Sequence, residues 1–269
     1  MASASDHVNK INVMKEEFGW DVPVELVPIP SKGIIYNPES SLHKKESVKI
    51  KAMTAREEDI LSSAALIKEG TVLDHLVNSC LMESIDASQM ITGDRNALMI
   101  AIRITGYGPE YPVLAYCKKC THQNDVNVDL TSIPIKRLTI PPVEEGKNLF
   151  KYTLPVTKKE VYFKFPTQAD ERDKSIKDKN LKQHIQSMVE SNITGNLELA
   201  IQQVGNVTDK NKIKHFILNM PAFDSRSLRK FMREAEPGMD MRCDWTCENC
   251  GHQNKSDIPI TSDFFWPST

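Results

Sequence analysis

The sequence lacks several features that would assign it to a common functional class. It has no hydrophobic run of transmembrane length, and its first residues lead into no apolar signal core. Basic residues are not in excess, since 34 Lys and Arg against 36 Asp and Glu give a formal net charge of −2 at pH 7. Nucleic-acid-binding proteins usually carry a basic field. We therefore expect a protein of the reducing cytoplasm that binds neither a membrane nor a nucleic acid.

Recognisable catalytic motifs are also missing. We find no Ser-His-Asp order, no His-Glu-x-x-His and no glycine-rich nucleotide loop. The segment Ser31-Lys32-Gly33 has too few glycines for a phosphate loop, and no helix is expected directly after it. The acidic pairs Glu57-Glu58 and Glu144-Glu145 fit a helix start and a linker. The sequence therefore predicts a non-enzymatic protein with no small-molecule substrate.

Four of the six cysteines form two matched pairs. The pattern Cys-x-x-Cys-x-His-Gln-Asn occurs twice, 130 residues apart (247 − 117). Strand-like residues flank each pair, so each is expected at the turn of a β-hairpin. Two thiolates from each turn complete a tetrahedral structural zinc site and leave no open position for catalysis. We predict one structural zinc ion per chain, held by Cys117, Cys120, Cys247 and Cys250.

The same cysteines allow other interpretations. A thioredoxin-type motif is single and opens a helix in an α/β pattern, and a disulfide framework is typical of secreted chains. His122 and His252 are alternative ligands, as is Cys243, although we expect the histidines to be turn residues. Cys80 is expected to be an inert buried thiol. A zinc ribbon that binds nucleic acid remains an alternative function.

The chain around the cysteines is expected to be a duplicated unit. Asp94 precedes Cys117 by 23 residues (117 − 94), and Asp224 precedes Cys247 by the same 23 (247 − 224). The predicted fold is α+β: two related halves of strand pair, helices and zinc hairpin, joined by a shared four-cysteine zinc-ribbon-like site. Neither pair of thiols is complete alone, so the halves should fold together. Each half also has a threonine that opens a helix and an acidic residue four positions later: Thr54 with Glu58, and Thr167 with Glu171.

Hydrophobic periodicity and turn residues predict the secondary structure. The run Thr54-Ala55-Arg56-Glu57 matches a helix capping box. Helices are expected over residues 55–69, 72–82, 93–105, 167–189, 197–204, 209–219 and 225–234. Strands are expected over residues 48–53, 149–155 and 161–165, with a short strand before Pro38.

These expectations divide the chain into five segments: an N-terminal arm (1–27), a first repeat with the first cysteine turn (28–133), a linker (134–147), a second repeat with the second cysteine turn (148–260) and an aromatic C-terminal tail (261–269). The arm shows apolar residues at helical spacing, which predicts an amphipathic helix. Arm and tail either cover the core of their own chain or dock on a neighbouring subunit. The candidate partner-binding residues are Val8, Ile11, Phe18, Phe264, Phe265 and Trp266.

Several blocks of the sequence resemble one known family. They are residues 29–36, 53–61, 93–98, 103–108, 220–226 and 264–267. These blocks resemble the baseplate hub subunit family of T-even-type tailed bacteriophages. The resemblance implies a structural subunit of the contractile-tail baseplate hub, made in the bacterial host cytoplasm and located in the virion baseplate, that contacts other hub or wedge proteins. It also leaves open an assembly catalyst or chaperone that is absent from the mature virion.

Overall fold

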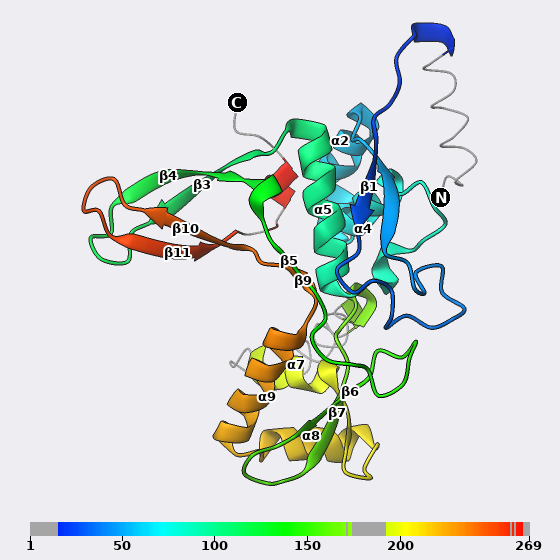
Figure 1. Cartoon of the computed structure of the whole chain (residues 1–269), viewed down its shortest axis with the longest axis vertical. Helices are drawn as coiled ribbons and strands as arrows, with labels where there is room; N and C mark the ends of the chain where they lie inside the picture. The colour runs from blue at the N-terminus through cyan, green and yellow to red at the C-terminus, as the bar shows by residue number, and fades with distance from the viewer. Residues whose placement is uncertain (1–15, 171, 174–191, 259, 261, 266–269) are drawn as a thin grey trace.

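The computed structural model describes residues 16–170, 172–173, 192–258, 260 and 262–265. The protein is α+β, with small antiparallel sheets, helices and an arm of two β-hairpins that projects from the body (Figure 1). One group of elements surrounds the long helix α5, and a second group lies at the other end of the molecule. Among the described residues, no helix is long and apolar enough to span a membrane.

The first group is a two-stranded sheet with a helical layer. Its elements are β1 (Val24–Pro28), β2 (Ser47–Lys51), α2 (Ala55–Ser62), α3 (Ala64–Glu69), α4 (Val72–Cys80), η1 (Ala87–Gln89) and α5 (Thr92–Tyr107). β1 and β2 pair antiparallel. Side chains four apart on α5, such as Leu98 and Ile102, are fully buried, so this helix forms the centre of the core. β1 begins within residues 1–27, the segment predicted as the N-terminal arm.

The second group, in the part of the chain that the structure describes, has a three-stranded antiparallel sheet packed with helices α7, α8 and α9. Its elements are β6 (Phe150–Thr153), β7 (Glu160–Phe163), α7 (Asn192–Ala200), β8 (Ile201–Val204), α8 (Lys210–Leu218) and α9 (Ala222–Ala235). β7 lies between β6 and β8. The rings of Phe150, Phe163 and Phe165 pack together with centroids 4.8 to 5.8 Å apart and form the core of this group.

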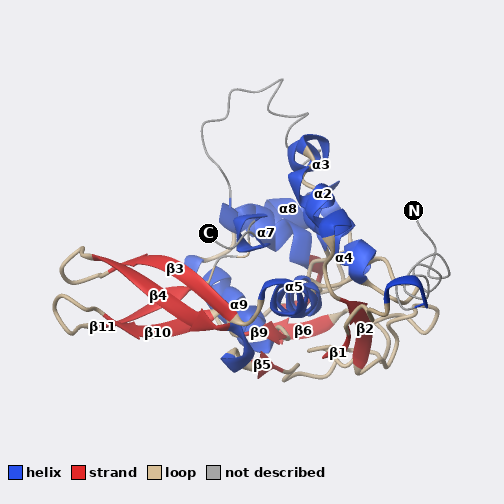
Figure 2. Ribbon diagram, turned by 90° about the horizontal axis from the view of Figure 1, so that it is seen from above, coloured by secondary structure: helices blue, strands red, loops and turns tan. Residues whose placement is uncertain are grey.

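The arm consists of two hairpins that lie side by side with their turns at the same end (Figure 2). The first is β3 (Glu110–Tyr116) with β4 (Gln123–Asp129), and the second is β10 (Arg242–Thr246) with β11 (Gln253–Asp257). The pattern of buried and exposed residues is identical, position by position, over 111–120 and 241–250. The two hairpins therefore have the same construction.

A short strand pair connects the arm to the body. After η2 (Leu130–Ser132), β5 (Ile135–Lys136) pairs with β9 (Gly238–Met239), so part of the predicted linker is structured. β9 crosses the start of α5 closely. A Cβ at Gly93 would lie 1.8 Å from the Pro237 carbonyl oxygen, so this crossing requires glycine.

The capping box predicted at the start of α2 is confirmed. The Thr54 N–H and hydroxyl donate to the Glu57 carboxylate at 2.9 and 2.6 Å. Lys51, at the end of β2, forms an ion pair with the same carboxylate at 2.7 Å. A threonine, an acid three residues later and a lysine three residues earlier thus fix the passage from strand to helix.

The second group contains the same trio. The Thr167 N–H and hydroxyl donate to the Asp170 carboxylate at 2.9 and 3.0 Å, and Lys164 forms an ion pair with it at 2.5 Å. The acids that cap the two helices therefore lie three residues after each threonine, directly before the equally spaced Glu58 and Glu171. A carboxylate at the third position reaches back to the N–H of the capping threonine.

Asp94, in the first turn of α5, holds the turn that follows β1. Its carboxylate is buried and accepts hydrogen bonds from the Ser31 N–H (2.8 Å), the Ser31 hydroxyl (2.5 Å) and the Tyr36 hydroxyl (2.7 Å). Lys32, next in the turn, adopts a left-handed φ of 53°. The carboxylate thereby ties the long helix to the first sheet.

Asp224, in the first turn of α9, holds the turn that follows β6 in the same way. It accepts from the Val156 N–H (2.7 Å), the Thr157 N–H (3.0 Å) and the Thr157 hydroxyl (2.8 Å). Lys158 follows with a φ of 55°. The equal spacing of the two aspartates from their cysteines therefore corresponds to equal roles.

Three secondary-structure predictions are corrected. The helix predicted over 197–204 ends at Ala200, because Ile201 and Val204 pair with β7 as β8. Residues before Pro38 form turns rather than a strand. The helix predicted over 55–69 is two helices, because Ser63 has an extended ψ of 104°. Most of the helix predicted over 167–189 lies outside the described residues.

The tail folds onto α5. Phe264 and Phe265, within η3 (Ser262–Phe265), are fully buried, and the Phe264 ring contacts Tyr111 edge-on at 4.9 Å. Buried Arg103 donates from Nε to the Phe264 carbonyl oxygen at 3.0 Å. The described part of the tail thus covers the first core. These two rings are not available as a partner-binding surface, because packing against the chain leaves nothing exposed.

Candidate metal centre

The turns of the two hairpins bring four cysteine sulfurs together. All four Sγ atoms lie within 4.8 Å of one another. Two close approaches join the two turns: Cys117 to Cys250 at 3.7 Å and Cys120 to Cys247 at 3.6 Å. Disulfide sulfurs lie about 2.05 Å apart, and all four cysteines are free thiols. Sulfurs about 2.3 Å from a central zinc ion would be about 3.8 Å apart, so the cluster has the dimensions of a tetrahedral site.

The backbone of each turn is folded to present its sulfurs. In both turns, the first cysteine donates its N–H to the carbonyl oxygen of the histidine five residues later, at 2.9 Å. The residue four positions after that cysteine donates back to its carbonyl oxygen, also at 2.9 Å. That residue is Thr121 in one turn and Gly251 in the other, with φ of 57° and 64°. Glycine adopts this conformation freely, whereas β-branched threonine is strained in it.

Asn124 connects the first hairpin to the second turn. Its side-chain oxygen accepts from the Glu248 N–H at 2.9 Å, and its amide nitrogen donates to the His122 carbonyl oxygen at 2.8 Å. The same nitrogen lies 3.7 Å from the Cys247 sulfur. One buried amide therefore supports its own turn, the opposite turn and a sulfur.

Asn254 makes the reciprocal contacts. It accepts from the Lys118 N–H at 3.0 Å, donates to the His252 carbonyl oxygen at 2.9 Å and lies 3.5 Å from the Cys117 sulfur. Sequence reasoning found both asparagines in the repeated His-Gln-Asn but assigned them no role. Their repetition at a fixed distance from the cysteines was the available signal.

Hydrogen bonds lower the pKa of the clustered thiols, whereas burial and the neighbouring sulfurs raise it. Burial opposes ionisation of Cys117, but backbone N–H groups of its turn and the Asn254 amide lower its pKa to about 6. Burial also opposes ionisation of Cys247, but hydrogen bonds from backbone N–H groups of its turn and from the Cys120 thiol lower its pKa. At Cys250, a backbone N–H favours the thiolate, but burial and the neighbouring sulfurs raise the pKa to about 12. Four adjacent thiolates can ionise together only beside a cation, so this donor set can hold a thiolate-binding metal ion.

The other two cysteines, Cys80 and Cys243, and the two histidines of the turns lie outside this cluster. Cys80 is fully buried, and burial raises its pKa to about 12. Cys243 donates through its thiol to the Ser256 carbonyl oxygen at 3.5 Å. His122 and His252 are exposed and serve the site through their backbone carbonyls.

The other predicted partner-binding residues, in the N-terminal arm and at the end of the tail, are only partly described. Phe18 is 72% exposed. Val8, Ile11 and Trp266 lie outside the described residues.

Comparison with known families identifies one match. Residues 35–266 match the family model described as T4 bacteriophage base plate protein. Comparison with curated proteins and with solved structures gives no match. The matched region covers most of the chain and includes α5, both hairpins and all four clustered cysteines. The chain belongs to the T4 bacteriophage base plate protein family.

Proposed function

We propose that this protein is a structural subunit of the contractile-tail baseplate hub, acting through contacts with other hub or wedge proteins. Family membership carries the proposal, because it supports a place in the phage tail baseplate. It also suggests a non-enzymatic role. The architecture is consistent with such a role, because a projecting arm with a closed four-thiol cluster suits a rigid contact element better than a reaction site.

We propose zinc as the metal, one ion per chain, ligated by Cys117, Cys120, Cys247 and Cys250. A four-sulfur tetrahedron is the usual donor set of structural zinc. The ligands come from hairpins 130 residues apart (247 − 117), so the ion would hold the two hairpins of the arm in one orientation. Elemental analysis of freshly prepared, reduced protein should give one zinc per chain, and a value near zero would contradict the assignment.

We also propose that the chain consists of two related units. The support is independent of the cysteines. The trio of lysine, threonine and acid has the same spacing and the same hydrogen bonds in both groups of elements. The aspartates that begin α5 and α9 hold equivalent turns. The second unit differs by its third strand and by the longer segment before α7.

Mass spectrometry of purified phage tails tests the function. A structural subunit should be present in a fixed ratio to other baseplate proteins, with cross-links to hub or wedge subunits. Presence in infected-cell lysate and in assembly intermediates, but absence from finished particles, would indicate an assembly catalyst or chaperone. Salt-sensitive binding to DNA or RNA without association with any baseplate fraction would indicate the nucleic-acid-binding alternative.

A further inference from the structure

The two hairpins of the arm provide an internal comparison. Positions 130 residues apart are equivalent in strand register and in burial. Their inner faces pack together, with Ala115, Trp245 and the cysteines in one cluster. Differences between their outer faces therefore do not arise from the requirements of the hairpin or of the sulfur cluster.

The outer face of the first hairpin is apolar at its centre. Leu114 and Tyr116 alternate along β3 and are 54% and 61% exposed. The Tyr116 hydroxyl donates to the Gln123 side-chain oxygen across the strand pair at 3.2 Å, which orients the ring on this face. Tyrosine is among the residues enriched in binding hot spots, and Leu114 adds exposed apolar area beside it.

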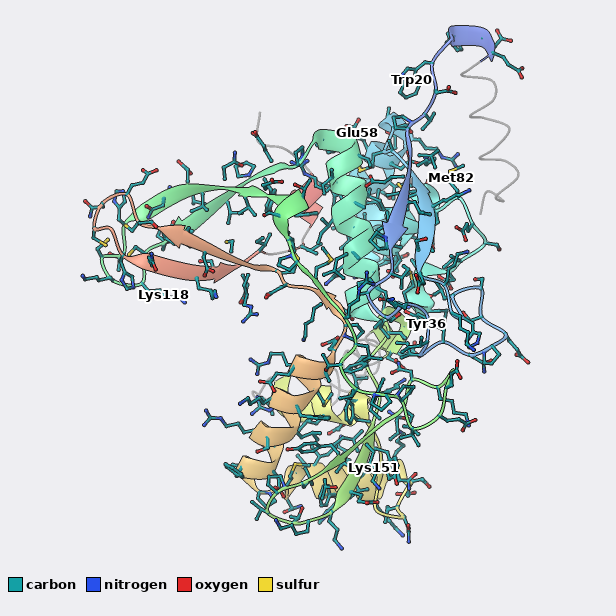
Figure 3. All side chains as sticks on the ribbon, viewed as in Figure 1. Trp20, Tyr36, Glu58, Met82, Lys118 and Lys151 are labelled. Carbon is teal, nitrogen blue, oxygen red and sulfur yellow. The ribbon has the colours of Figure 1, made fainter. Side chains whose placement is uncertain are left out.

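Acidic residues surround this apolar centre. Asp125 is opposite Leu114 in the register, and Glu110 is opposite Asp129 at the base of the hairpin. All three acidic side chains are exposed, and among the described residues none of them forms an ion pair. The sequences of β3 and β4 contain no Lys, Arg or His to offset these negative charges. Lys118, labelled in Figure 3, reaches instead toward the second hairpin, where its Nζ donates to the Lys255 carbonyl oxygen at 3.0 Å.

The outer face of the second hairpin is polar and balanced in charge. Asp244 and Thr246 occupy the positions equivalent to Leu114 and Tyr116 (114 + 130 and 116 + 130). Asp244 forms an ion pair with Lys255 across the strands at 3.2 Å. The second hairpin thus forms with an Asp and a Thr at these two positions. The apolar pair on the first hairpin is therefore not needed for folding of the hairpin.

We propose that the outer face of β3 and β4 is a docking surface for a different protein subunit, one that presents apolar side chains bordered by Lys or Arg. The inference rests on the proposed function and specifies which face of the chain makes contact. Leu114 and Tyr116 supply the apolar contact, while Glu110, Asp125 and Asp129 select a basic border. A second copy of this chain is a poor occupant, because two such faces would bring six carboxylates together.

Site-specific photo-cross-linking in infected cells tests this surface. A benzophenone amino acid replaces Tyr116 in one variant and Thr246 in the matched control, and baseplate intermediates and finished tails are both isolated. The Tyr116 variant should cross-link to one baseplate protein, at a peptide with Lys or Arg beside apolar residues. The control should give at least tenfold less of that product.

Substitutions that make the first hairpin polar like the second test the energetics. The double variant Leu114→Asn/Tyr116→Thr should retain its metal content and lower incorporation into baseplate intermediates at least tenfold. The matched variant Asp244→Asn/Thr246→Ser should stay within twofold of the wild type. Equal cross-linking from both positions, cross-links to a second copy of the chain, or normal incorporation of the double variant would overturn the docking surface. Absence of the wild-type chain from every baseplate fraction would instead overturn the proposed function, and the inference with it.

Discussion

Replacement of Asn124 or Asn254 by alanine should weaken zinc binding without removing a ligand. Each side chain makes two hydrogen bonds of 2.8 to 3.0 Å that connect its own turn to the opposite turn. A hydrogen bond contributes about 1 kcal/mol net, so the loss of both is about 2 kcal/mol. This corresponds to a loss of affinity of roughly 30-fold, within the about 10- to 100-fold range of outer-shell metal-site mutations.

Competition with a chromophoric chelator measures this loss. Asn124→Ala and Asn254→Ala should lose affinity equally, within about threefold, because their contacts are reciprocal. Gln123→Ala removes an exposed neighbour of Asn124 and serves as the control, with an affinity near that of the wild type. Zinc affinities of both asparagine variants equal to that of the control would refute the idea that these amides support the site. Loss at only one asparagine would refute the reciprocity.

Three further predictions concern the cysteine ligands, the left-handed residue of each turn and the buried carboxylate of Asp94. Cys117→Ser or Cys250→Ser should abolish stoichiometric zinc and lower the melting temperature by more than either asparagine variant, measured by elemental analysis and calorimetry; a folded, zinc-loaded variant would contradict the ligand set. Thr121→Gly should raise stability by up to about 1 kcal/mol, since it relieves a left-handed φ of 57°, while Gly251→Thr, at φ 64° and with open space around it, should lower stability; urea unfolding that gave the opposite signs would exclude backbone strain as the cause. Burial raises the pKa of Asp94 from an ordinary value of 3.8 to about 6, so the folded state binds the extra proton and stability falls as pH rises from about 4 to about 6. Asp94→Asn removes this dependence, so the variant should be more destabilised at pH 4.5 than at pH 7, by about 2 kcal/mol of difference in urea titrations; a constant difference would show that the carboxylate does not titrate in this range.

Local signals in the sequence were sufficient to predict the structure where the contacts that form it join residues close in the chain. The capping box at Thr54 joins residues three apart, and each Cys-x-x-Cys turn is closed by hydrogen bonds within six residues. The matched cysteine pairs also led to one cluster, because a tetrahedral metal site needs four ligands and each turn offers two. β8 could not be recognised in this way, since Ile201 and Val204 form a strand only through pairing with β7. Tertiary pairing there overrides a helical pattern.

The two aspartates show how equal spacing and unequal chemistry combine in this chain. Asp94 and Asp224 each receive three hydrogen bonds from the turn after a strand, yet the pKa of Asp94 is raised and that of Asp224 is lowered. Burial opposes ionisation at both, but Asp94 lies far deeper in the protein than Asp224. In addition, Asp224 accepts two backbone N–H bonds and Asp94 accepts one, with hydroxyl groups completing each set. Backbone N–H groups are fixed dipoles that favour the carboxylate, whereas a hydroxyl can rotate to accept from a protonated acid. Repeated spacing therefore predicts where an anchoring aspartate lies, while the depth of its burial and the donors around it decide the direction of its pKa shift. The two hairpins show the same combination of equal backbone and unequal chemistry. At equivalent backbone positions, β3 and β4 carry an apolar face with an acidic border, whereas β10 and β11 carry a polar face with balanced charges.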